Sequence, residues 1–142
     1  MTYVLGFLFD SKNRNKVLLI EKLRPSWMHG KLNAPGGKIK MLEKPLTAMV
    51  REFKEETDLF IPSWKKFGEL NVGAGEIVYL FTSDSDDIYK FKKTTDEQPI
   101  IFNYLDLLGA VKLMKNILWM IPMARNCLLY DSGYYVVEES SI

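Results

Sequence analysis

The chain has 142 residues, the size of one ordinary globular domain, so we expect a single domain over residues 1–142. Its 47% hydrophobic content can fill a substantial core, and its net charge of +1 excludes the broad basic surface that duplex nucleic acid or an anionic membrane requires. With Cys127 as the only cysteine and His29 as the only histidine, an internal disulfide, a cysteine zinc cluster and a histidine-pair zinc site are excluded.

The first half of the chain predicts a β-hairpin, a loop and a helix. Residues 3–9 and 17–20 are apolar, rich in β-branched and aromatic side chains, and separated by a polar turn. Residues 24–37 contain two prolines and three glycines, which favour a loop. Pro45 suits the first position of a helix, which we expect to end near Asp58.

The second half predicts further strands and one more helix. In chain order we expect strands at 66–71 and 76–82, a polar surface loop at 83–87, a strand at 100–104, a helix at 119–129 and a strand at 134–137. The glycines of residues 73–75 indicate a hairpin turn and not a phosphate-binding loop. Because strands and helices do not alternate regularly, the fold class is α+β, with helices packed on a mixed sheet.

The N-terminal segment indicates where the protein resides. Residues 3–9 lack the basic region of a signal peptide and are followed directly by Asp10. No apolar run approaches the roughly 20 residues needed to cross a bilayer. We expect a cytoplasmic protein without membrane partners, either a monomer or a homodimer.

The predicted helix carries three glutamates on one side. The face expected to pack against the sheet comprises Leu46, Met49, Val50 and Phe53. Glu52, Glu55 and Glu56 fall in an arc of about 100° beside that face. Like charges at this spacing destabilise a helix by a few tenths of a kcal/mol per pair, and the helix dipole disfavours anions near a C-terminus. The cluster therefore predicts either a site for a hard divalent cation or a solvated acidic face.

The spacing around these glutamates resembles the Nudix box. Gly37 is followed six residues later by Glu43, and the run from Arg51 to Glu56, Arg-Glu-Phe-Lys-Glu-Glu, begins eight residues after Glu43. Asp58 departs from the pattern, because the family usually has a glycine there that ends the helix in a left-handed conformation, which aspartate also tolerates. The resemblance implies an α/β/α sandwich and Mg²⁺-dependent cleavage of a diphosphate linkage, with Mn²⁺ as the alternative cation.

The resemblance also implies a role for each matching residue. The implied metal ligands are Gly36 (through its carbonyl), Glu52, Glu55, Glu56 and Glu97, with Asp96 as the alternative to Glu97. Glu55 or Glu52 would activate the attacking water, and Arg51 would orient the glutamates. Glu43 would support the loop or bind a second metal through water. An exposed acidic turn is the alternative for Glu97.

Outside the box, the chain resembles the MutT-type branch, which hydrolyses nucleoside triphosphates, including oxidised ones, to monophosphate and pyrophosphate. The implied substrate-binding residues are Lys22, Arg24, Trp27, Asn33, Gly37, Lys38, Asn116 and Trp119. Trp27 would stack on the base or cap the core, and Asn33 would contact the base or only form a turn. Lys22 and Arg24 would bind phosphates or stay solvated.

One departure and several alternatives concern the substrate. Asn116 and Ile117 stand where the MutT-type branch usually has an acidic pair. The same box also serves hydrolases of ADP-ribose, NADH, dinucleoside polyphosphates and capped RNA. A Nudix-fold domain that binds a nucleotide without catalysis is the alternative of another class.

Overall fold

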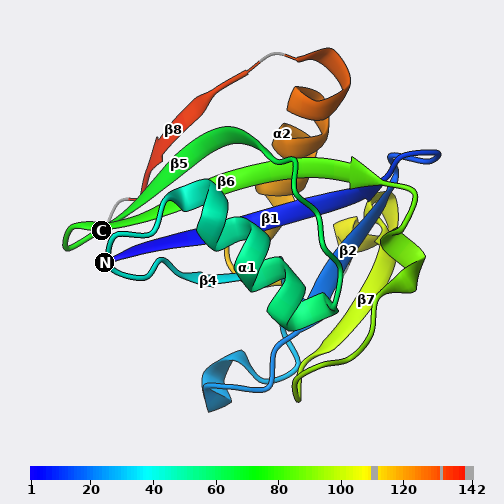
Figure 1. The fold of residues 1–142 in the computed structure, drawn as a ribbon, viewed down its shortest axis with the longest axis horizontal. Helices are drawn as coiled ribbons and strands as arrows, with labels where there is room; N and C mark the ends of the chain where they lie inside the picture. Colours follow the sequence, from blue (N-terminus) through cyan, green and yellow to red (C-terminus); the bar gives the residue numbers. More distant parts are fainter. Residues whose placement is uncertain (110–111, 132, 140–142) are drawn as a thin grey trace.

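The backbone forms a mixed β-sheet that lies between two helices (Figure 1). The structure, a computed structural model, describes residues 1–109, 112–131 and 133–139. The strands are β1 (Thr2–Asp10), β2 (Lys16–Glu21), β3 (Leu32–Asn33), β4 (Gly36–Lys38), β5 (Lys65–Gly73), β6 (Glu76–Ser85), β7 (Gln98–Asn103) and β8 (Tyr135–Glu138). The helices are α1 (Pro45–Thr57) and α2 (Ile117–Tyr130), with 3₁₀ turns at Ser26–Met28, Ile88–Lys90 and Tyr104–Gly109. This arrangement confirms the predicted α+β class and the α/β/α sandwich.

Strand β1 joins the two halves of the sheet. It runs parallel to β6 over its whole length, and its other edge is shared between two antiparallel partners. Residues Tyr3–Leu5 pair with β4, whereas Leu8 and Phe9 pair with β2. Between them, the N–H of Gly6 donates to the carbonyl of Pro35 at 2.9 Å. The short strand β4 is thereby fixed beside the first half of β1, where it contacts α1.

Helix α1 covers one face of the sheet. The helix and the sheet pack together through a cluster of buried side chains. Its members are Val4, Leu8, Leu18, Ala48, Met49, Phe53, Leu59, Ile61, Trp64, Phe81 and Ile88. The helix approaches closely because Gly6 has no side chain: a Cβ there would lie 2.6 Å from Cε of Met49. The predicted face is confirmed for Met49 and Phe53 but wrong for Leu46, which is 44% exposed, because the helix turns Ala48 toward the sheet instead.

Both ends of α1 agree with the sequence prediction. Pro45 occupies the first turn, where its missing N–H costs no hydrogen bond. Asp58 adopts the left-handed conformation, with φ 63° and ψ 14°, and its N–H donates to the carbonyl of Lys54 at 2.9 Å. Asp58 therefore ends the helix in the same conformation for which glycine is usually selected.

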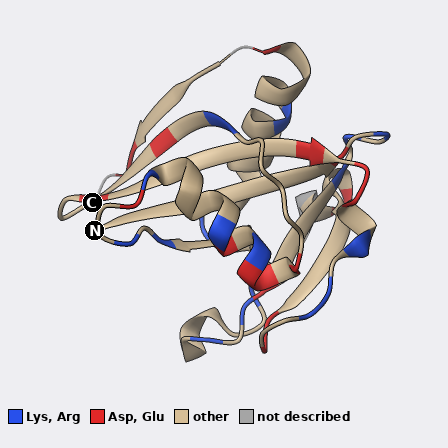
Figure 2. Ribbon diagram, in the orientation of Figure 1, with Lys and Arg blue, Asp and Glu red and all other residues tan. Residues whose placement is uncertain are grey.

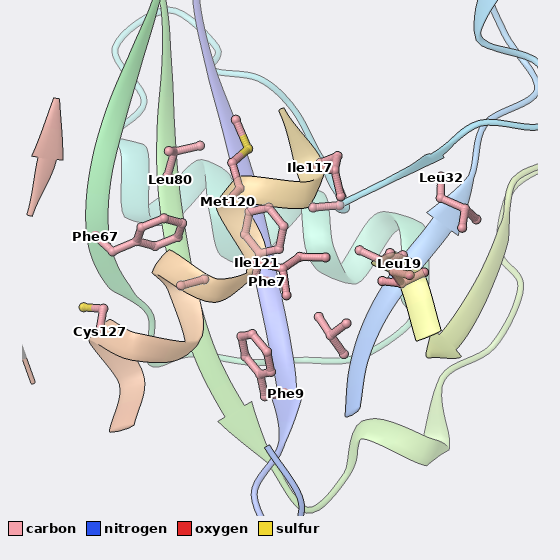
Figure 3. Close-up of a cluster of buried hydrophobic side chains, with 14 of the residues drawn as sticks. Phe7, Phe9, Leu19, Leu32, Phe67, Leu80, Ile117, Met120, Ile121 and Cys127 are labelled. Atoms are coloured by element: carbon pink, nitrogen blue, oxygen red, sulfur yellow. The ribbon is translucent and has the colours of Figure 1, made fainter. Parts of the chain in front are cut away.

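Helix α2 covers the opposite face. Phe7, Phe9 and Leu19 point from the sheet toward the helix, and Met120 and Ile121 of α2 lie over them in the same buried cluster (Figure 3). The side chains of β1 therefore alternate between the two clusters with the period of two expected for a strand buried on both faces. No helix among the described residues combines the length and apolarity needed to cross a membrane.

Several element boundaries differ from the predictions. The stretch 24–37 is not a loop throughout, because the backbones of β3 and β4 find partners in β2 and β1. Residues 83–87 are not all loop: β6 continues to Ser85, and the buried hydroxyl of Ser83 donates to the carbonyl of Ser63 at 2.6 Å. Helix α2 begins at Ile117, two residues before its predicted start. The predicted hairpins β1–β2 and β5–β6 are confirmed as antiparallel pairs.

Candidate metal and nucleotide site

Arg51 of α1 binds three glutamates, Glu43 from the segment before the helix and Glu52 and Glu55 from the helix itself. Its Nε and Nη2 donate to the two oxygens of Glu43, both at 2.8 Å, in a bidentate ion pair. Its Nη1 donates to Glu52 at 2.8 Å and lies 3.4 Å from Glu55. In Figure 2 the C-terminal half of α1 carries adjacent blue and red segments, which are its basic and acidic residues. The remaining hydrogen bond of Arg51 is to the carbonyl of Lys38 at 3.1 Å, which ties α1 to β4.

The ion pairs and the burial act differently on the three carboxyl groups. The hydrogen bonds from Arg51 lower the pKa of Glu43 to about 2, against an opposing effect of burial, with help from the N–H of Lys40. Burial raises the pKa of Glu52 above its ordinary value, although Arg51 acts in the opposite direction. The side chain of Glu55 is 53% exposed, so it is the glutamate most open to solvent.

Glu56 is the buried member of the cluster. It is only 7% exposed, and its Oε1 accepts a hydrogen bond from the N–H of Gly36 at 2.9 Å. Its Oε2 is buried without a hydrogen-bond partner. Burial raises the pKa of Glu56 to about 8, although Gly36 and the nearby Lys22 favour the charged form. A buried carboxylate oxygen without a partner is costly unless a proton or a cation neutralises it.

The two glycines of β4 are required by their neighbours. A Cβ at Gly36 would overlap the carbonyl oxygen of Val4 on the paired strand. A Cβ at Gly37 would lie 2.5 Å from the carboxyl carbon of Glu52. Gly36 therefore permits the strand pairing, and Gly37 permits Glu52 to lie against the backbone of β4.

The glutamates share one side of α1 without converging on a single point. Among residues 1–109, 112–131 and 133–139, no three acidic, histidine or cysteine side chains are grouped closely enough to hold a metal ion. Glu52 and Glu55 are drawn toward Arg51, whereas Glu56 is held by Gly36. The donor set nevertheless fits a hard divalent cation, because it consists of oxygens and includes the unpartnered Oε2 of Glu56.

Two further acidic residues from the loop before β7 lie near the site. The two oxygens of Glu97 are 3.0 and 3.2 Å from Nζ of Lys22, and its side chain is 19% exposed. The alternative of an exposed acidic turn is therefore wrong for Glu97. Asp96 is 69% exposed and forms a surface ion pair with Arg24. The charge of Glu97 contributes to the raised pKa of Glu56.

A cavity of about 590 Å³ lies beside β4 and the first half of β1. The cavity has the size and the largely apolar lining of small-molecule sites. The implied substrate residues that line it are Lys22, Arg24, Trp27, Asn33, Gly37 and Asn116. Trp27 is 61% exposed, so the alternative that it caps the core is wrong.

Two implied substrate residues do not line this cavity. The side chain of Lys38 is exposed to solvent. Lys38 contributes to the site through its backbone carbonyl, which accepts a hydrogen bond from Arg51. Trp119 packs against the α2 core cluster and donates from Nε1 to Oδ1 of Asn116 at 2.8 Å. Trp119 therefore reaches the cavity only through Asn116. Asn33 lines the cavity and also accepts a local hydrogen bond from the N–H of Ala34, so both of its predicted alternatives stay open.

The structure adds cavity residues that the sequence reading did not identify. The apolar walls are contributed by Tyr3, Leu5, Leu70, Val72, Val78, Met114 and Met120, and charged groups by Glu76, Lys115 and Glu139. The alternating apolar pattern of the strands could have identified the wall residues. Glu139 carries no such signal, because it follows the last strand in a polar tail.

The sequence profile of the NUDIX domain matches residues 1–118, most of the chain. The chain belongs to the Nudix family. Membership makes it a Nudix pyrophosphohydrolase, from a family that generally uses divalent metal ions and binds nucleotide derivatives. No curated protein sequence matches the chain significantly.

Solved Nudix structures share the fold at low sequence identity. The NUDIX domain of Shewanella oneidensis NrtR, complexed with ADP ribose, has a TM-score of 0.70 at 18% identity, covering 89% of this chain and 86% of that one. A NUDIX family hydrolase from Clostridium perfringens has a TM-score of 0.68 at 23% identity, covering 89% and 97%. The MutT protein of Methanosarcina mazei Go1 has a TM-score of 0.69 at 19% identity, covering 86% and 90%. At these identities the likeness shows the Nudix fold alone.

Gly36 and Gly37 of β4 are expected to give different mutant defects. Gly37→Ala is expected to displace Glu52, a side chain, and so to lower the Mg²⁺ affinity with a stability loss of only about 1–2 kcal/mol. Gly36→Ala is expected to unfold more readily, because its Cβ meets backbone that cannot move away. Calorimetric Mg²⁺ titration and urea denaturation of both variants test the difference. Equal stability loss in both would contradict this account of the glycines.

Proposed function

We propose that the protein hydrolyses a nucleoside triphosphate to a monophosphate and pyrophosphate, using Mg²⁺. The observation that carries this proposal is the position of β4. Gly36 and Gly37 line the cavity, and the same two residues contact Glu56 and Glu52 of α1. A nucleotide whose base lies in the cavity would therefore extend its phosphates past β4 toward the glutamates.

Basic side chains lie along that path. Lys22 lines the cavity and is close enough to Glu56 and Glu97 to interact with both. Arg24 lines the mouth of the same cavity and is 80% exposed. Ammonium and guanidinium groups form strong charge-assisted hydrogen bonds to phosphate oxygens. In this proposal Lys22 and Arg24 bind the phosphate chain, and the base lies in the cavity beyond them.

In this proposal the carboxylates hold the cation, and one of them handles the proton. Glu52, Glu55, Glu56, Glu97 and the carbonyl of Gly36 would be the ligands. The cation, when bound, would polarise the phosphoryl oxygens and lower the pKa of a bound water. Glu55 is our candidate for the group that removes the proton of the attacking water, because its side chain is the most exposed of the cluster.

Product analysis tests the proposed reaction. The protein is incubated with Mg²⁺ and a panel of the canonical dNTPs, 8-oxo-dGTP, ADP-ribose, NADH and Ap4A, and the products are separated by ion exchange. Monophosphate and pyrophosphate from a triphosphate are expected. Orthophosphate as the first product would contradict the proposal. Turnover of ADP-ribose or a dinucleotide alone would replace the proposed substrate, and a folded protein without turnover would favour a binding domain.

Metal binding is expected to depend on pH through Glu56. Because the pKa of Glu56 is raised to about 8, this group is mostly protonated at pH 7 and must lose its proton to bind a cation. The Mg²⁺ affinity should therefore rise by up to about tenfold per pH unit below pH 8 and level off above it. Calorimetry in buffers of different ionisation enthalpy measures the released proton. An affinity that stays constant from pH 6 to 9 would remove Glu56 from the ligand set.

A further inference from the structure

Three polar side chains form a group at one end of the cavity, at the N-terminus of α2. Nδ2 of Asn116 donates to Oε2 of Glu139 at 3.0 Å, and Nζ of Lys115 lies 2.8 Å from Oε1. All three residues line the cavity. The apolar side chains that line the same cavity include Leu70 and Val72 of β5, Val78 of β6, Met120 of α2 and Met114, which precedes α2. This group therefore supplies hydrogen-bonding capacity to these apolar walls, where Glu76 of β6 is a further charged side chain.

The amide of Asn116 has a fixed orientation. Its Oδ1 accepts from Nε1 of Trp119 at 2.8 Å, and an indole N–H is a donor only. Oδ1 must therefore face Trp119, and Nδ2 must face Glu139. Both ends of the amide are engaged before any ligand enters, so Asn116 fixes the position of the Glu139 carboxylate.

The carboxylate of Glu139 has acceptor capacity to spare. The hydrogen bonds from Lys115 and Asn116 lower its pKa, so the group is ionised and accepts hydrogen bonds only. A carboxylate has about four acceptor positions, and two are used here, one on each oxygen. One position on each oxygen is left to accept a hydrogen bond from a ligand.

We propose that Glu139 determines base specificity by accepting two hydrogen bonds from a guanine-type edge, in which a ring N–H stands beside an exocyclic amino group. The inference rests on the proposed function, in which the base occupies this cavity. Adenine would present a ring-nitrogen lone pair to the carboxylate, which is repulsive. Hypoxanthine keeps the ring N–H but lacks the amino group, so it would fill only one of the two acceptor positions.

Nucleotide binding in EDTA tests this assignment without relying on catalysis. The affinities of GMP, IMP and AMP are measured by calorimetry for the wild type and for Glu139→Gln. Wild-type protein is expected to bind GMP about tenfold or more tightly than IMP, and AMP most weakly. Glu139→Gln replaces one acceptor with a donor, so GMP affinity should fall by about 10- to 100-fold while IMP affinity changes less.

Two further variants test whether Glu139 contacts the base or only stabilises this end of the cavity. Glu138→Gln alters a neighbouring exposed carboxylate of β8 that does not line the cavity, and should change none of the affinities. Lys115→Met removes the ion pair but leaves both carboxylate oxygens, so it should keep the preference for GMP over IMP. Loss of that preference in Lys115→Met as well as in Glu139→Gln would show that the ion pair only braces this end of the cavity, and would overturn the proposal.

The outcomes distinguish this inference from the proposed reaction. Selective GMP binding that is lost in Glu139→Gln supports the inference even if no triphosphate is hydrolysed, a result that would contradict only the reaction. Hydrolysis of dGTP and dITP at the same rate, together with equal binding of GMP and IMP, would keep the reaction and overturn the role of Glu139. Failure of GMP to bind at all would also overturn it.

Discussion

Replacing Glu56 by glutamine is expected to lower kcat by about 10²- to 10⁴-fold without unfolding the protein, because a metal ligand contributes several kcal/mol to transition-state stabilisation. Glutamine keeps the size of the side chain and an oxygen for the N–H of Gly36. It lacks the charge that the buried Oε2 position would supply to a cation. Steady-state kinetics with Mg²⁺, using the best substrate of the panel, measures the effect.

The stability of the same variant provides its control. The folded-state pKa of Glu56 is raised to about 8, so wild-type stability without metal should fall as pH rises from about 4.5 through 8. Glutamine resembles the protonated acid, so Glu56→Gln should match the wild type near pH 4 and exceed it by a margin that grows up to about pH 8 in EDTA. Glu138→Gln, an exposed replacement, should change neither property. A Glu56→Gln protein with full activity would remove the metal-site assignment.

The features that were predicted from the sequence depend on local patterns. The apolar run of β1 and the position of Pro45 are properties of neighbouring residues, and the structure agrees with both. The same holds for Asp58, whose left-handed conformation follows from its place at the end of α1. The placement of three glutamates on one side of α1 required only the helical period.

The features that were missed depend on contacts between distant segments. The pairing of β4 with β1 is a backbone interaction, which Gly36 and Gly37 could not indicate because they have no side chains. Arg51 was expected to orient the glutamates, but nothing in the sequence showed that it would bind Glu43 in a bidentate pair and leave Glu56 to Gly36. The side-chain partners are set by how β4 approaches α1.

Glu139 is the clearest example of such a contact. It lies 23 residues after Asn116 and reaches that residue because β8 pairs in parallel with β5, which carries the chain back to the cavity. The resemblance to the MutT-type branch predicts an acidic pair at the start of this helix, where the chain has Asn116 and Ile117. The structure instead places the carboxylate of Glu139, which follows β8, beside Asn116. A comparison limited to the residues at the start of α2 does not detect it.

Replacing Arg51 by methionine is expected to lower the free energy of unfolding by about 3 kcal/mol at pH 7. Arg51 and Glu43 are 20% and 11% exposed, and removing one partner of a largely buried pair leaves the other charge uncompensated. The pKa of Glu43, lowered from 4.5 to about 2, corresponds to a stabilisation of about 3 kcal/mol at roughly 1.4 kcal/mol per pKa unit.

The pH dependence identifies the ion pair as the cause of this loss. Because the folded-state pKa of Glu43 is depressed, its contribution is complete above pH 4.5 and disappears as pH falls from 4.5 toward 2. Urea denaturation should therefore show a large difference between wild type and Arg51→Met at pH 7 and a much smaller one at pH 3. Arg14→Met, which breaks the more exposed pair with Asp84, should cost less than about 1 kcal/mol. If Arg51→Met lost no more stability than Arg14→Met, or lost the same amount at both pH values, Arg51 would not be the residue that holds α1 and the glutamates to β4.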